Sequence, residues 1–212
     1  MKKTSAFVAA ILCALLGIGN AASAAESKSE KTPELFETSF AYEATGNLDK
    51  SLNAVLQILR LDTGHYLGNL RAGWLNYRKG RYDESIKFYR KAISLKAKAI
   101  EPKLGMMLPM MAARRWSDAE VLAKEVLGVA PNNYLAGSRL AFIYFSLGKY
   151  RQAEKQYKRV LEAFPSEIDM MLGLGWTYVK QGRKKEAEEI FKEVLTIRRQ
   201  NLNARAGLEA LQ

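Results

Sequence analysis

Glycine, replaced once by arginine, returns every 34 residues along most of this chain, at Gly46, Gly80, Arg114, Gly148 and Gly182. Five residues after each of these positions the side chain is small again: Ser51, Ser85, Ala119, Ala153 and Ala187. A fixed period of this length is typical of proteins in which one short supersecondary unit is stacked on copies of itself. Because such units contact only their neighbours, the period predicts one elongated array.

The fourth unit, residues 134–167, shows best what each copy should look like. Apolar residues recur at helical spacing in both of its halves: Leu140, Ala141 and Tyr144, then Ala153, Tyr157 and Val160. Gly148 separates the halves, where the chain has to reverse and where glycine adopts a left-handed conformation at little cost. Pro165 closes the unit because proline cannot continue a helix. Each unit is therefore predicted to be two short helices joined by a tight turn.

Two further columns complete the pattern. Seven residues before each turn position stand Ser39, Gly73, Met107, Ala141 and Gly175, and large aromatic side chains recur in second helices at Tyr89, Tyr157 and Phe191. From about Thr32 to Arg199 the sequence resembles the tetratricopeptide repeat family.

The resemblance implies an all-α fold, a right-handed superhelical solenoid of five helix-turn-helix repeats with a C-terminal capping helix. The expected repeats span about 32–65, 66–99, 100–133, 134–167 and 168–199, with the cap in 200–212. We expect Leu202, Ala206 and Leu208 of the cap to face inward, covering the apolar end of the array.

The third repeat departs from the pattern. Arg114 replaces the turn glycine, Met107 replaces a small residue, and Pro109 falls inside the expected first helix among four methionines. An interior proline removes one backbone hydrogen bond and costs about 3 kcal/mol unless the helix bends. The methionines indicate either an adaptable, kinked centre or space filling around the proline. In both interpretations the third repeat is expected to be the weakest.

The first 24 residues are predicted to be a secretory signal peptide. Lys2 and Lys3 precede a short apolar stretch, and small residues follow it at the cleavage site. An uncleaved anchor is the alternative. Cys13, the single cysteine, follows Leu12 where a lipoprotein signal would have a small residue, so we reject lipidation. Residues 25–31 form a polar, flexible leader in this interpretation, and the expected location is the bacterial periplasm.

The net charge is strongly positive, +11 for the chain and +9 after loss of Lys2 and Lys3 with the signal peptide. Basic residues are spread over second helices and turns, where a solvated convex face would lie. The alternative is an anionic partner such as a membrane surface, a glycan or an acidic protein. Nucleic acid is not expected, because the chain carries none of the usual nucleic-acid motifs.

The residues needed for catalysis are not found together in this sequence. No nucleophile is paired with histidine, and there is no glycine-rich phosphate loop or cluster of metal ligands. His65 is the single histidine. We therefore predict no catalytic residues, no metal, no cofactor and no small-molecule substrate.

A second apolar face runs along the first helices, about 120° from the hairpin core. Thirteen of its fifteen positions are apolar or aromatic. In the tetratricopeptide repeat family this face lines a concave groove that binds peptides. The predicted groove residues are Leu70, Trp74, Tyr77, Leu104, Leu108, Met111, Phe142, Phe145, Leu172 and Trp176. The alternative is that these side chains are buried by neighbouring helices or by the leader.

These observations predict a non-enzymatic scaffold that binds an apolar or aromatic segment, such as a helix, of another envelope protein. The family's carboxylate-binding groove is not transferred, because its lysine and asparagine positions hold residues such as Leu104, Leu108 and Phe142. The main alternative is a basic protein that binds anionic glycan or lipid through its convex face. Salt separates the two, because screening weakens the second kind of binding steeply.

Overall fold

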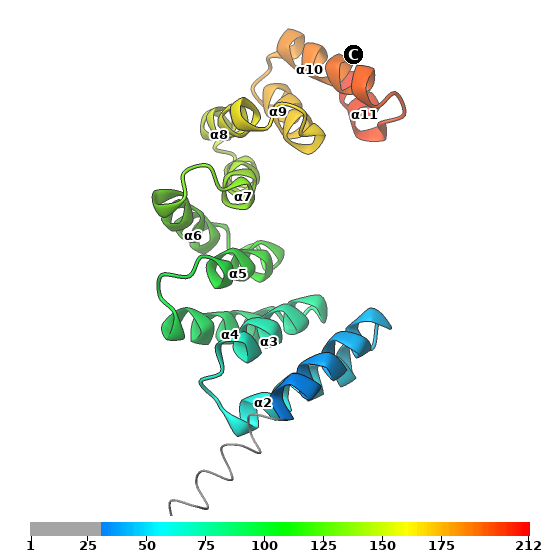
Figure 1. Ribbon diagram of the computed structural model, residues 1–212. Coiled ribbons are helices and arrows are strands. Elements are labelled where there is room, and N and C mark those ends of the chain that lie inside the picture. The colour runs from blue at the N-terminus through cyan, green and yellow to red at the C-terminus, as the bar shows by residue number, and fades with distance from the viewer. Residues whose placement is uncertain (1–30) are drawn as a thin grey trace, which may run out of the picture.

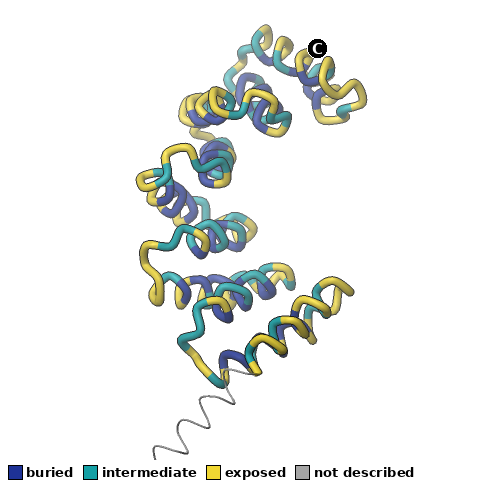
Figure 2. Tube along the Cα trace, viewed as in Figure 1, coloured by how far each residue is buried: buried dark blue, intermediate teal, exposed yellow. Residues whose placement is uncertain are grey.

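The computed structural model describes residues 31–212. The predicted signal peptide (1–24) and most of the predicted leader (25–31) lie outside these residues. Within them the regular elements are eleven helices and no strands, which confirms the all-α solenoid. The helices stack into an arc, with α5, α7 and α9 on its inner side and α6 and α8 on its outer side (Figure 1). Buried positions follow the contacts between successive helices along the whole arc (Figure 2).

Each repeat is one helical hairpin. The first is formed by the helix of residues 31–44 and α2 (Leu48–Leu61). The following three are α3 (Tyr66–Arg78) with α4 (Tyr82–Leu95), α5 (Glu101–Ala112) with α6 (Trp116–Val129), and α7 (Tyr134–Ser146) with α8 (Tyr150–Ala163). The last is α9 (Ile168–Lys180) with α10 (Lys184–Ile197), and α11 (Leu202–Glu209) follows as the cap.

The turn inside every hairpin has the same backbone conformation. The φ angle is 70° at Gly148, which confirms the predicted left-handed turn, and it lies between 70° and 76° at the other three glycines. Arg114 adopts the same conformation with a φ of 56°, although its Cβ makes this unfavourable. A hydrogen bond of 2.9 Å from the Lys149 N–H to the Tyr144 carbonyl closes the end of the preceding helix.

We expect the two kinds of turn to respond oppositely to substitution. Gly148→Val should lower the free energy of unfolding by about 1–2 kcal/mol, because a branched residue resists positive φ. Arg114→Gly should raise it by up to about 1 kcal/mol by relieving that strain. Urea denaturation of both variants and the parent measures the changes. Equal midpoints for all three proteins would contradict the prediction.

Aromatic side chains of two second helices pack against glycines in the helices on either side. The Tyr89 ring lies between Gly73 of α3 and Gly105 of α5, where added Cβ atoms would come within 2.9 Å and 2.4 Å of it. Phe191 lies in the same way between Gly175 and Gly207, with separations of 2.6 Å and 2.4 Å. A contact this short leaves no room for any side chain, so the aromatic ring requires both small positions.

The third repeat has a small residue at the aromatic position and larger residues at the two glycine positions. Ala123 stands at the aromatic position, and Met107 and Arg139 stand at the two positions that glycine fills around Tyr89. Met107 and Ala123 are fully buried. The larger residue at position 107 is thus accommodated in the core together with a small one at position 123, and the expectation that the third repeat is the weakest stays a prediction. The helix α5 also continues through Pro109, which is itself buried.

The register of the cap also differs from the expectation. Ala204 and Gly207 are buried, whereas Leu202 is 77% exposed and Ala206 is exposed. Of the three residues expected to face inward, Leu208 packs against the core. The register follows from Phe191, since a Cβ at Gly207 would lie 2.4 Å from its ring and only glycine fits there.

Ion pairs join the last three repeats at matching positions. Glu154 of α8 pairs with Lys158 at 2.8 Å and with Arg183 of the next repeat at 2.9 Å. One repeat earlier, Glu120 pairs in the same way with Lys124 and Lys149. Burial alone would raise the pKa of Glu154, but hydrogen bonds from Lys158, Arg183 and Gln181 outweigh it and lower the pKa from 4.5 to about 2.

This lowered pKa predicts a loss of stability in acid. A carboxylate with a lower pKa in the folded state stabilises the protein above its unfolded pKa, and the stabilisation is lost as the pH falls from about 4.5 towards 2. Glu154→Gln should therefore remove about 1 kcal/mol at pH 7 and almost nothing near pH 2, since its partners are partly screened by water. Denaturation across this pH range measures the difference. The matched control is Glu162→Gln, at an exposed residue of the same helix, and an identical pH profile for both variants would refute the prediction.

Candidate binding groove

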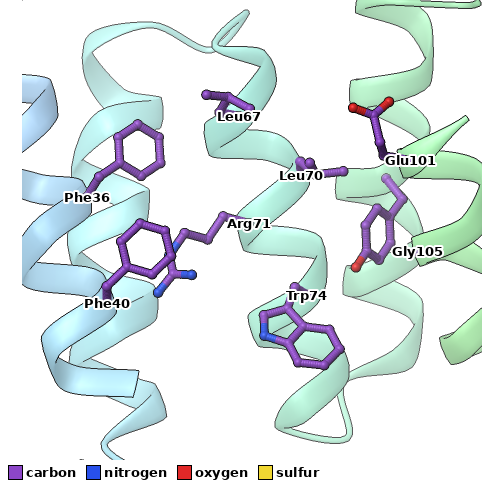
Figure 3. A pocket seen from close by; sticks show the side chains of 9 residues that line it. Phe36, Phe40, Leu67, Leu70, Arg71, Trp74, Glu101 and Gly105 are labelled. Carbon is purple, nitrogen blue, oxygen red and sulfur yellow. The ribbon is translucent and has the colours of Figure 1, made fainter. Parts of the chain in front are cut away.

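A mainly apolar hollow of about 450 Å³ lies at the N-terminal end of the inner side of the arc. Side chains from the helix of residues 31–44, from α3 and from α5 surround it (Figure 3). Its lining residues are Phe36, Phe40, Leu67, Leu70, Arg71, Trp74, Tyr89, Glu101 and Gly105. A preformed apolar cavity with few polar groups is the usual form of a binding site.

Arg71 joins the two sides of this hollow. Its guanidinium carbon lies 3.7 Å from the centre of the Phe40 ring, and its Nε donates a 2.8 Å hydrogen bond to Ser39 Oγ. It also pairs with Glu43 at 2.9 Å, and the Arg71 side chain is 10% exposed. The arginine is therefore a neutralised part of the wall, and its position holds Phe40 in place although that ring is 52% exposed.

Glu43 also fixes Trp74. One of its carboxylate oxygens accepts a 2.7 Å hydrogen bond from Trp74 Nε1 and lies 3.5 Å from the Arg78 guanidinium. Charge-assisted hydrogen bonds of this kind hold an aromatic ring in one orientation. The walls of the N-terminal hollow are thus positioned before any partner binds.

A second hollow, of about 350 Å³, lies further along the same side between α5, α7 and α9. Phe142 is its most prominent aromatic residue, 46% exposed and packed edge-on against Trp116 at 5.9 Å. The lining residues are Met111, Ser138, Arg139, Phe142, Tyr157, Asp169, Met170, Leu172, Gly173 and Asn203. This hollow mixes apolar and polar groups, unlike the first.

The predicted groove residues are divided between these hollows and the spaces around them. Leu70 and Trp74 line the first hollow, and Met111, Phe142 and Leu172 line the second, although Leu172 is only 6% exposed. The other five predicted residues, all half-buried, are not in the lining of either hollow: Tyr77, Leu104, Leu108, Phe145 and Trp176.

Three of these five side chains are partly buried by contacts with aromatic rings close by. Tyr77 packs against Tyr82 at 6.2 Å, and Phe145 packs against Tyr150 at 5.7 Å, each within its own hairpin. Trp176 packs against Phe191 at 5.6 Å and donates a 2.5 Å hydrogen bond to Asn203. Among the described residues, the predicted groove residues are therefore found partly in these two hollows and partly in local aromatic contacts.

Comparison with known families agrees with this architecture. Two tetratricopeptide repeat models match the sequence, one over residues 41–100 and the other over residues 134–200. Together they cover more than half of the chain. The chain belongs to the tetratricopeptide repeat family.

Solved tetratricopeptide repeat structures share the fold at low sequence identity. A protein from Parabacteroides merdae matches with a TM-score of 0.79 and 20% identity, over 86% of this chain and 72% of its own. MamA from Desulfovibrio magneticus matches with a TM-score of 0.75 and 17% identity, over 81% and 97%. YrrB, described as having an unusual peptide-binding site, matches with 0.73 and 17%, over 89% and 97%. A comparison with curated protein sequences found no match.

Sequence reasoning left several residues out of the tetratricopeptide repeat groove. Phe36 and Phe40 occupy equivalent first-helix positions but were not in the predicted set. Leu67 and Arg71 lie outside the fifteen first-helix positions on which that prediction rested. The repeat alignment carries a signal for Arg71, because its position is glycine in two other repeats and in the cap, and arginine in one repeat.

His65 has a structural role in this tetratricopeptide repeat protein. Its Nδ1 accepts a 3.0 Å hydrogen bond from the Gly68 N–H at the start of α3, and its ring lies 5.5 Å from that of Phe36. Residues 31–212 contain no group of three His, Cys, Asp or Glu residues arranged to hold a metal ion. In the same part of the chain no helix has the length and apolar character needed to cross a bilayer.

Proposed function

We propose that this protein is a non-catalytic scaffold that binds an apolar or aromatic segment of another protein in its N-terminal hollow. The observation that carries the proposal is an apolar hollow of about 450 Å³ on the inner face. Tetratricopeptide repeat proteins generally act as scaffolds for interactions with other proteins, and this supports the proposal.

The fixed walls favour binding of a preformed partner surface. Phe40 and Leu67 are 52% and 54% exposed, so a partner's side chain would remove apolar surface from water on both sides of the hollow. Because Arg71 and Trp74 are already held by Glu43, little side-chain freedom would be lost on binding. A short segment with aromatic or branched apolar side chains, such as one face of a helix, fits this chemistry.

The proposed place of action is the bacterial envelope, with the partner being another envelope protein. This part of the proposal rests on the predicted signal peptide of residues 1–24 and on the predicted absence of cysteine from the exported chain. Sequencing the N-terminus of protein recovered from the periplasmic fraction tests it. A chain found only in the cytoplasm with its first 24 residues intact would refute the location without affecting the binding proposal.

Two exposed leucines offer a matched test of the binding site. Leu67 lines the N-terminal hollow, whereas Leu135 lies two repeats further on, is 44% exposed and lines neither hollow. Proteins captured from envelope extract by the parent should be captured by Leu135→Glu but lost with Leu67→Glu. Retention by Leu67→Glu, or equal loss with both variants, would show that the hollow is not the binding site.

A second candidate function is supported by the distribution of charge. Residues 66–115 hold twelve Lys and Arg residues against three Asp and Glu, a net charge of +9. Arg90 and Lys91 of α4 and Lys98 after it are exposed. A basic surface of this kind would bind an anionic glycan or lipid. Binding lost at high salt and with Arg90→Glu and Lys91→Glu, but kept with Leu67→Glu, would favour this second function.

A further inference from the structure

We propose that the second hollow binds an acidic side chain in the partner's segment, which forms an ion pair with Arg139. The inference rests on the proposed function and adds a charge requirement to it: an apolar group in the first hollow and an aspartate or glutamate at the second.

The packing of the repeats explains why position 139 can hold an arginine. In the helices that follow a second helix, the equivalent residues are Arg71, Gly105, Gly173 and, in the cap, Gly207. Each of the three glycines faces an aromatic ring of the preceding second helix, with an added Cβ only 2.4 Å from that ring. The two arginines follow second helices that carry Val55 or Ala123 at the aromatic position. An arginine thus follows each second helix that lacks the aromatic ring.

The two arginines differ in how their charge is balanced. Arg71 pairs with Glu43 at 2.9 Å and donates to Ser39. Arg139 donates one 2.6 Å hydrogen bond, from Nη1 to the Leu104 carbonyl oxygen, and forms no ion pair with any Asp or Glu among residues 31–212. A guanidinium has five N–H donors, so Arg139 keeps most of its capacity for a partner.

The groups around Arg139 leave its charge unbalanced. Tyr77 and Tyr89 are the titratable side chains that act on it, and burial raises the pKa of Tyr89, which keeps this phenol neutral. Burial also lowers the pKa of Arg139, in the direction expected for a partly desolvated cation. Asp169 lines the same hollow but is exposed and does not pair with Arg139. An incoming carboxylate would supply the missing counter-charge with bidentate geometry.

The surroundings favour an acidic side chain within a segment over a carboxylate at its end. Met111 of α5 and Phe142 of α7 line the hollow together with Met170 and Leu172 of α9. A segment that contacts these apolar groups and also reaches the N-terminal hollow must continue past Arg139. The acidic group is therefore expected at an internal position.

Selection of peptides tests this inference directly. A displayed library of random 16-residue peptides is selected against the purified protein and, in parallel, against Arg139→Gln. Glutamine removes the charge and keeps a polar side chain, and thermal denaturation checks that the variant is folded. Peptides selected by the parent should share apolar residues and one acidic position, and those selected by Arg139→Gln should share only the apolar residues.

Synthetic peptides then measure the preference. Changing the shared Glu to Gln should weaken binding to the parent about tenfold and binding to Arg139→Gln hardly at all. Arg151→Gln, which removes the same charge from an exposed site on α8, should keep the tenfold preference. Amidation of the peptide's C-terminus should have no effect.

The possible failures are distinct. Apolar peptides without a shared acidic position would overturn the inference and leave the proposed function standing. Recovery of no peptides that compete at the N-terminal hollow would overturn the proposed function and the inference with it. Loss of binding on amidation would assign Arg139 to a terminal carboxylate and contradict the internal position.

Discussion

Gly173→Arg should destabilise the protein by about 3 kcal/mol, the upper end of the usual effect of adding atoms to a packed core. A Cβ at Gly173 would already lie 2.4 Å from two carbons of the Tyr157 ring, so the ring or the helix would have to move. Tyr157→Ala should be equally harmful, at about 3–5 kcal/mol, because it leaves a cavity where a fully buried ring was.

The two changes together should cost less than their sum. The double variant reproduces the pairing of Ala123 with Arg139 found one repeat earlier, so the arginine has the space left by the ring. We expect a coupling of about 1–3 kcal/mol in a double-mutant cycle measured by urea denaturation. Gly173→Arg combined with Phe191→Ala, which removes a ring that faces other glycines, is the control and should be additive. Additivity in both pairs would show that the pairing has no energetic basis.

Trp74→Ala should weaken partner binding by about 2 kcal/mol, roughly thirtyfold, as expected when a central aromatic anchor is removed. The Trp74 ring forms a wall of the N-terminal hollow and is held there by its hydrogen bond to Glu43. Its loss should cost less stability than the 3–5 kcal/mol typical of a fully buried aromatic residue, since Trp74 is only half-buried. Titration of a labelled partner segment, with parallel thermal denaturation, measures both quantities.

Glu43→Gln distinguishes the contact that Trp74 makes with a partner from the role of Glu43 in positioning the wall. The glutamine can still accept the Trp74 hydrogen bond through its amide oxygen but no longer balances Arg71. A small loss of affinity with Glu43→Gln and a large one with Trp74→Ala is the expected pattern. If Trp74→Ala unfolds the protein while leaving the affinity of the folded fraction unchanged, Trp74 is a core residue and not an anchor.

The repeat period was sufficient to predict the fold because each hairpin is defined by local features. The turn glycines need positive φ, and the apolar spacing of helices such as α8 identifies their buried face. Arg114 shows that the residue type at one position is not enough to predict the backbone conformation there. It adopts the glycine conformation, so the turn is preserved although its residue type is not.

The groove was harder to predict because burial there depends on pairs of residues in different helices. Tyr77 and Phe145 have the same helical spacing as exposed groove residues, yet they pack against Tyr82 and Tyr150 of the following helices and are half-buried. Arg71 and Arg139 were overlooked for the same reason. Their place in the groove becomes clear only when each is compared with the second helix that precedes it. The cap was misjudged because the ring of Phe191, and not the apolar pattern of α11, sets its register.

The alternation of rings and arginines also gives the repeats a fixed order. Each second helix fits only the kind of first helix that follows it: Tyr89 requires Gly105, and Ala123 leaves room for Arg139. Removing residues 100–133 would preserve the 34-residue period yet place Tyr89 against Arg139, where the ring and the side chain need the same space. Repeats one and three are interchangeable at this junction, and so are repeats two, four and five, but members of the two groups are not. The chain therefore resists loss of repeat three and duplication of repeat two or repeat four, each of which would place an aromatic ring against an arginine, although the period alone would permit them.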